Sequence, residues 1–188
     1  NKIRVFKTKK KSGTGAAPRN IGIKHSKGDY ICLIDSDDLW EKDKLELQLK
    51  QVLSKNTLYT TKAKYFNSKN LKSSFLINFI RGKIQEYIIK KINKNGFQWF
   101  YIYNPIVTSS ILAHRNVFKS TLFDEDKNSR EDLDMWILLR KKNVKFSLLK
   151  NISVNIFRRD QSSSSDFKKE LVTLIRSLSN IYFKFNEF

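Results

Sequence analysis

The chain has 188 residues, of which 40% are hydrophobic and 29% charged, and this length is typical of one compact domain. Its single cysteine, Cys32, excludes a disulfide framework and a zinc site built from several cysteines. No apolar run reaches the roughly 18–20 residues that a membrane-spanning helix needs.

The chain carries 37 lysines and arginines against 18 acids, which gives a net charge of +19. This charge fits attraction to phosphate in nucleic acid, anionic lipid or a nucleotide, and it equally fits a lysine-rich composition whose side chains are simply solvated. Two short windows, 29–46 and 124–134, hold 13 of the 18 acids. Acids gathered in this way indicate helix caps or a cation site, whereas a general nucleic-acid binder would not focus negative charge.

Strands and helices alternate along the first half of the chain. Residues 30–34 are a continuous apolar run, as expected of a central strand buried on both faces. From composition and apolar spacing we expect strands at 3–6, 30–34 and 58–66, and helices at 16–24 and 41–54.

The second half opens with the clearest amphipathic helix, at 75–92, whose apolar side chains recur at helical spacing. The alternation of strands and helices along the whole chain predicts an α/β sandwich with a largely parallel sheet. The other elements expected in this half are strands at 107–113, 144–149 and 152–157, helices at 131–141 and 167–185, and a polar linker at 162–165.

Three acids, Asp35, Asp37 and Asp38, follow directly after the apolar run at 30–34. Ligands of open α/β sheets bind beyond the carboxyl ends of the strands. Carboxylates two residues apart can converge there on a magnesium or manganese ion that holds a diphosphate. The structural alternative is that Asp38 caps the next helix and Asp35 closes a turn. Three acids in four residues favour the cation site.

Several motifs occur in a fixed order: Arg19-Asn20-Ile21-Gly22-Ile23, Lys27-Gly28-Asp29-Tyr30-Ile31, Leu33-Ile34-Asp35-Ser36-Asp37-Asp38-Leu39-Trp40, and Lys44-Leu45-Glu46 with Gln48. In this order they resemble the first half of a family 2 glycosyltransferase of the GT-A fold. Later segments resemble further blocks of that family, so the similarity spans about residues 3–165. These segments are Thr108-Ser109-Ser110, Phe123-Asp124-Glu125, Glu131-Asp132-Leu133-Asp134-Met135-Trp136 and Phe157-Arg158.

The resemblance implies a three-layer α/β/α sandwich with a mostly parallel central sheet. Residues 1–157 would form its core, and residues 158–188 would form a linker and an amphipathic helix. The first strand of the family's domain would precede Ile3, so we expect an N-terminally truncated domain. An inactive fragment of a glycosyltransferase is therefore one alternative for this chain.

The resemblance also implies roles for the acidic turn and two arginines. Asp37 would bind the divalent metal, Mn²⁺ or Mg²⁺, on the donor diphosphate, and Asp35 would face the nucleotide ribose or the metal's water shell. Arg19 would lie near the nucleotide, although Pro18 departs from the family's usual alanine. Arg158 would contact the diphosphate.

Asp132 matches the family's general base. An acceptor hydroxyl is a poor nucleophile, so a carboxylate within hydrogen-bond reach must take its proton as it attacks the anomeric carbon. The structural alternative is that Glu131 and Asp132 stabilise a helix N-terminus through its dipole. Because both acid clusters match one family, we expect catalysis by Asp132.

Together these features predict an inverting glycosyltransferase that uses a nucleotide-diphosphate sugar, expected to be a UDP-sugar. The acceptor would be a glycan or a lipid-linked hydroxyl compound in bacterial cell-surface polysaccharide or lipopolysaccharide synthesis. We expect a cytoplasmic protein that can contact the inner face of the plasma membrane through the helix at 75–92 or the helix at 167–185, and that can form homo-oligomers. The alternative, favoured for the helix at 75–92, is that these helices bury their apolar stripes against the sheet or a partner subunit. The alternative is a basic nucleic-acid-binding domain, but no nucleic-acid signature is present, so we expect no such partner.

Overall fold

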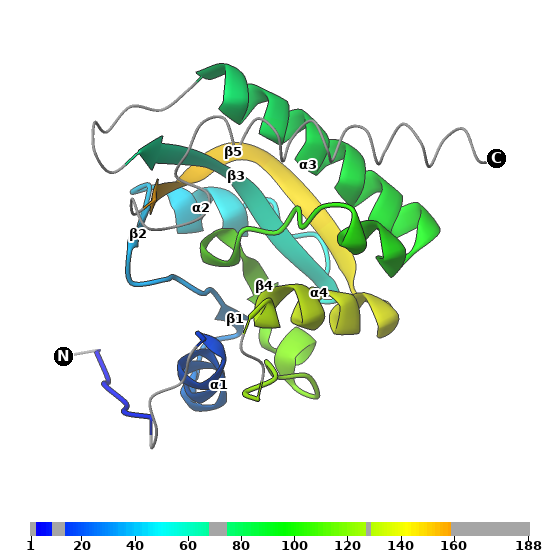
Figure 1. Cartoon of the computed structure of the whole chain (residues 1–188). Coiled ribbons are helices and arrows are strands. Elements are labelled where there is room, and N and C mark those ends of the chain that lie inside the picture. Colours follow the sequence, from blue (N-terminus) through cyan, green and yellow to red (C-terminus); the bar gives the residue numbers. More distant parts are fainter. Residues whose placement is uncertain (1–2, 9–13, 68–74, 127–128, 159–188) are drawn as a thin grey trace.

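The computed structural model describes residues 3–8, 14–67, 75–126 and 129–158 (Figure 1). The expected linker at 162–165 and helix at 167–185 lie outside the described residues. The helices are α1 (Ala16–His25), α2 (Lys44–Leu49), α3 (Phe75–Asn95) and α4 (Glu131–Lys141), with 3₁₀ turns η1 (Phe97–Tyr101), η2 (Thr108–Ser110) and η3 (Arg115–Phe118). The strands are β1 (Tyr30–Ile31), β2 (Asp38–Trp40), β3 (Thr57–Asn67), β4 (Leu112–His114) and β5 (Lys145–Arg158).

The five strands form one sheet in the order β1-β4-β3-β5-β2. The long strands β3 and β5 run parallel, and α3 and α4 lie in the chain between them, as a parallel crossover requires. The three remaining pairings, β1–β4, β4–β3 and β5–β2, are short and antiparallel. The expected α/β fold is confirmed, but the described sheet is mixed rather than mostly parallel, because the short strands β1, β2 and β4 all run antiparallel to their neighbours.

Hydrophobic side chains pack on both faces of the sheet. Alternate residues of a strand point to opposite faces, so Leu58 and Tyr59 of β3 enter different clusters. Leu58 packs in the main core with Phe146 of β5 and Ile88 of α3, a helix that lies along the β3–β5 pair (Figure 1). Tyr59 packs with Leu149 in a smaller cluster on the other face. The sheet is therefore the middle layer of the fold.

The strands expected at 3–6 and 30–34 are absent or shortened among the described residues. Residues 3–8 form no strand, and Ile3 and Val5 are 78% and 84% exposed. Only Tyr30–Ile31 of the run at 30–34 pairs, with β4, and Ile34 is 51% exposed. An apolar run becomes a strand only where a neighbour accepts and donates its backbone hydrogen bonds.

Strand β5 also changes two other expectations. The strands expected at 144–149 and 152–157 are one strand, which follows β3 through register shifts between Thr61 and Ala63. Such irregularities bend a strand and increase its twist. The helix expected at 41–54 is shorter, and it begins only at Lys44 because the backbone N–H of Glu41 donates to Ser153 O of β5 at 3.0 Å.

Helix α3 buries Ile84, Ile88 and Ile92, so most of its apolar stripe faces the core, while Phe75 and Phe79 at its start are exposed. Among the helices that the structure describes, none combines the length and apolar character required to cross a bilayer.

Candidate functional site

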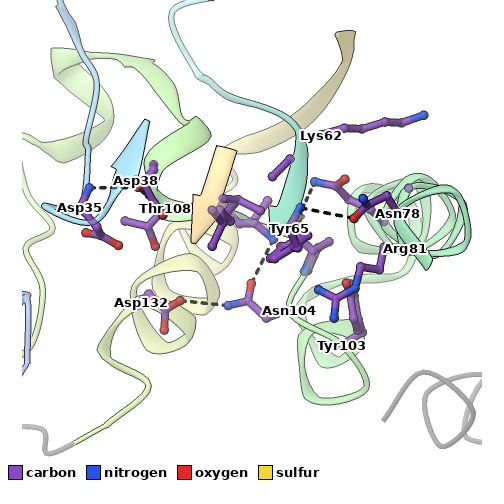
Figure 2. A pocket seen from close by; sticks show the side chains of 18 of the residues that line it. Asp35, Asp38, Lys62, Tyr65, Asn78, Arg81, Tyr103, Asn104, Thr108 and Asp132 are labelled. Atoms are coloured by element: carbon purple, nitrogen blue, oxygen red, sulfur yellow. Dashed lines mark hydrogen bonds between the residues drawn. The ribbon is translucent and has the colours of Figure 1, made fainter. Parts of the chain in front are cut away.

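The two acid clusters of the sequence line one pocket of about 510 Å³ (Figure 2). Asp35, Asp37 and Asp38 reach it from the turn before β2 and the start of that strand, and Asp132 reaches it from the first turn of α4. The clusters are almost a hundred residues apart, and the fold brings them to the same cavity.

Arg19 of α1 links these two clusters directly. Its Nη2 lies 2.7 Å from Asp35 Oδ1, and its Nη1 lies 2.8 Å from Glu131 Oε1. The guanidinium also lies over the Phe123 ring, 5.4 Å from its centroid. Burial disfavours the charged form, but the bonds and the attraction to both acids prevail and raise the pKa of Arg19. Arg19 therefore stays charged and holds α1, the acidic turn and α4 together.

Gly15 leaves the room that this guanidinium occupies. A Cβ atom at Gly15 would lie 2.6 Å from Arg19 Cζ, closer than atoms can approach without moving. Because Arg19 is bound at both ends of its guanidinium, it cannot move aside without losing an ion pair. The glycine before α1 therefore belongs to the site.

Ser109 orients the acidic turn from the opposite side. Its Oγ donates to Asp38 Oδ2 at 2.5 Å and accepts the backbone N–H of Asp35 at 3.0 Å. Burial raises the pKa of Asp38, as do the charges of Asp35 and Asp37, while the bond from Ser109 lowers it. Asp38 begins β2, and the N-cap residue of α2 is Asp43, so the alternative that Asp38 caps this helix is wrong.

Lys44 is a buried cation that packs against Trp40, the last residue of β2. Lys44 is 1% exposed; its Nζ lies 4.1 Å from the centroid of the Trp40 ring and donates to Gln48 Oε1 at 2.6 Å. Gln48 Nε2 donates in turn to Ser110 O at 2.9 Å. Burial lowers the pKa of Lys44 to about 8. Sequence reasoning treated Lys44 and Gln48 as parts of a motif and missed this packing role.

Asp132 is held by two hydrogen bonds. Its Oδ1 accepts the backbone N–H of Leu133 at 2.8 Å, and its Oδ2 accepts Asn104 Nδ2 at 3.1 Å. Burial raises the pKa of Asp132, although these bonds and the charge of Arg19 oppose the rise. Sequence reasoning missed Asn104, which carries no local signal and reaches Asp132 only through the fold.

A second cavity, of about 720 Å³, adjoins the first and shares Asp35 and Asp37 with it. Its other lining residues come from the N-cap of α1, from α1 itself and from the segment after it: Gly15, Pro18, Arg19, Gly22, Ile23, Ser26, Tyr30, Ile31, Cys32, Leu33, Ile34 and Ser36. Asp35 and Asp37 therefore stand at the boundary between two cavities.

The acids fit a divalent cation that also binds substrate. Within the described residues, no group of three or more Asp, Glu, His or Cys side chains could hold a metal. Asp35 Oδ1 binds Arg19 and Asp38 Oδ2 accepts a hydrogen bond from Ser109. Asp37 is exposed and lines both cavities. Mg²⁺ is commonly bound by one or two carboxylates together with substrate phosphates, and this donor set suits that mode.

Arg158 ends β5 next to Phe157, which lines the first pocket, and its side chain lies outside the described residues. Its expected contact with a diphosphate stays a prediction.

Comparisons with known proteins agree on one family. Residues 1–122 match the model of glycosyl transferase family 2. An uncharacterized glycosyltransferase of Rickettsia felis is 32% identical over 96% of this chain and 28% of its own length. The amylovoran biosynthesis glycosyltransferase AmsB of Erwinia amylovora is 29% identical over 72% of this chain and 44% of its own.

The fold is similar to that of S. aureus TarS 1–349, solved in complex with UDP-GlcNAc. The TM-score is 0.58 at 18% sequence identity, over 94% of this chain and 50% of that one. The chain thus spans half or less of each of these three proteins.

Proposed function

Because this chain belongs to glycosyl transferase family 2 and has a fold of the GT-A type, we propose that it transfers a sugar from a nucleotide diphosphate to an acceptor hydroxyl with inversion. One observation carries the proposal: Asp37 and Asp132 line the same pocket, and Arg19 joins their two segments. Inversion needs a group that binds the leaving diphosphate on one side of the anomeric carbon and a base for the attacking hydroxyl on the other side.

We propose that the donor nucleotide lies in the cavity beside α1, with its diphosphate at Asp37. Arg19, Asp35 and Asp37 border that cavity. Asp37 would hold a Mn²⁺ or Mg²⁺ ion, with Asp35 beside it. Such an ion neutralises charge on the departing diphosphate. A UDP-sugar is the proposed donor, in line with the UDP-GlcNAc bound to TarS.

Asp132 is the proposed general base in the neighbouring pocket. Its carboxylate takes the proton of the acceptor hydroxyl while that oxygen forms a bond to the anomeric carbon. The bond from this carbon to the diphosphate oxygen breaks, and the diphosphate leaves with the electron pair. Asn104 and the Leu133 amide hold the carboxylate in place, and its raised pKa makes it a stronger base.

The proposed pathway is bacterial surface polysaccharide or lipopolysaccharide synthesis, supported by the name of the amylovoran enzyme. The cytoplasmic location, the contact with the plasma membrane and the homo-oligomer stay predictions.

Metal-dependent binding of UDP tests the donor site. With MnCl₂ present, UDP should bind and stabilise the protein, and Asp37→Ala should abolish the metal-dependent part. Asp126→Ala removes an exposed acid outside both cavities and should change nothing. Equal UDP affinity in the Asp37 variant and the parent protein would remove the basis of the proposal.

A further inference from the structure

The pocket that holds Asp132 has walls of opposite charge. Asp35, Asp38 and Asp132 lie on one side, and Arg81 lies on the other with Asn78 and Tyr103 (Figure 2). Lys62 of β3 and Arg81 of α3 are the two cationic residues among those that line this pocket in the described chain. Neither belongs to the motifs that resemble the family, and the proposed function has used neither.

Arg81 is fixed by aromatic packing. Its guanidinium carbon lies 4.2 Å from the centroid of the Tyr65 ring. Near this stack, the backbone N–H of Tyr65 donates to Asn78 Oδ1 at 3.4 Å, which connects β3 to α3. A guanidinium stacked on a ring directs its N–H donors outward in its own plane, in a fork that matches an oxyanion.

Lys62 of β3 also lines this pocket, and its side chain passes α3 at Gly82. A Cβ atom at Gly82 would lie 3.2 Å from Lys62 Cε and 3.4 Å from its Nζ. The lysine side chain therefore lies against α3 at Gly82, and its ammonium points away from the Arg81 guanidinium (Figure 2). Glu86 is the only acid between positions 47 and 123, and it pairs with Lys90 at 3.0 Å. The segment that supplies this wall thus carries a strong excess of positive charge.

This positive wall lies in the pocket with Asp132, whereas Arg19 borders the other cavity. If the donor diphosphate lies at Asp37, between the two cavities, then the positive wall faces the acceptor, which carries the attacking hydroxyl. We propose that Arg81 binds an anionic group of the acceptor, a phosphate or a carboxylate, near the hydroxyl that Asp132 deprotonates, and that the positive charge of Lys62 strengthens this binding. This inference rests on the proposed function and names its acceptor class.

Small molecules titrated into the full chain test whether binding in this pocket requires a negative charge on the ligand. Glycerol 3-phosphate and glucuronate represent the two oxyanions, and glycerol and glucose are their uncharged counterparts. We expect both anions to bind by NMR titration, with glycerol and glucose at least tenfold weaker. Arg81→Gln should weaken anion binding about tenfold, since one charge-assisted bond is worth roughly 1.5 kcal/mol or more. The ratio of the two anion affinities tells phosphate from carboxylate.

Matched variants separate this site from net charge and from folding. Lys83→Gln removes an exposed cation of the same helix outside the pocket, and anion binding should persist. Lys62→Gln should weaken it, and Arg81→Lys should retain part of it. If Arg81→Gln lowers the melting temperature, the Lys62 variant still decides the question. Equal losses in the Lys62 and Lys83 variants would overturn the proposal.

UDP binding distinguishes this proposal from the proposed function. Arg81→Gln should leave UDP affinity unchanged, and a parallel loss of UDP would assign Arg81 to the donor and overturn the acceptor site. If UDP fails to bind the parent protein while anions still require Arg81, the proposed donor fails but the anion site stands.

Discussion

Arg19 and Glu131, which are 112 positions apart in the chain, form an ion pair of 2.8 Å between Nη1 and Oε1. The other end of the same guanidinium binds Asp35 at 2.7 Å. One side chain therefore sets the separation between the acidic turn and the start of α4. Since the proposed metal and the proposed base belong to these two segments, their spacing depends on Arg19.

Replacing Arg19 by Met should destabilise the protein by about 1–3 kcal/mol, because it leaves two partly buried carboxylates without their cation. Urea unfolding measures this change. Lys50→Gln breaks the exposed pair with Glu46 and should cost less than about 1 kcal/mol. A double-mutant cycle with Glu131→Gln should give a coupling energy, and strict additivity would show that the pair is not formed.

Gly15→Ala should weaken the site through Arg19. The new methyl group would meet a guanidinium that two acids hold, so UDP affinity and stability should both fall. In an Arg19→Ala background the same change should cost little. Gly22→Ala is the control for stability: a Cβ atom there would have no neighbour within 4 Å, and the residue lies inside α1, so the change should stabilise the protein by about 0.5–1 kcal/mol. Equal effects of both alanines would contradict the contact.

Ser109→Ala should raise the pKa of Asp38 further, because it removes the bond that lowers that pKa. It also frees the Asp35 amide, so the acidic turn should lose order. NMR titration of the carboxyl carbons measures the pKa, and Ser120→Ala, at an exposed serine that lines neither cavity, serves as control. An unchanged Asp38 titration would count against the bond.

Asp132→Asn should lower the rate of sugar transfer by about 10²–10⁴-fold and leave UDP affinity unchanged. Asp134→Asn, in the same helix turn but outside the pocket lining, should retain the rate. Since burial raises the pKa of Asp132, the acidic limb of the pH–rate profile should lie above the usual aspartate range. Asn104→Leu removes a bond that lowers this pKa, so the limb should move further upward.

Lys44 should make stability depend on alkaline pH. Its pKa falls from 10.5 to about 8 on folding, so the folded state releases this proton before the unfolded state does. The unfolded state then binds more protons between these values, and this group's contribution to the free energy of unfolding rises with pH across that window. Lys44→Met should remove this rise. An unchanged slope between the variant and the parent protein would show that Lys44 does not titrate early.

Local sequence was sufficient for the elements and motifs whose signal lies within a few residues. Apolar spacing located α3 and α4, and β-branched and aromatic residues located β3. The acids at 35–38 and at 131–132 stood out through their density alone. These features depend on side-chain periodicity and composition, which each segment carries without its neighbours.

Pairing across the chain decided the rest. Residues 3–6 have the composition of a strand and form none among the described residues, whereas Asp38–Trp40 has no strand pattern and pairs with β5. The bonds of Arg19 to Asp35 and Glu131, and of Asn104 to Asp132, join segments that share no local signal. Backbone ladders and ion pairs require a partner at a definite distance, and only the folded chain supplies that distance.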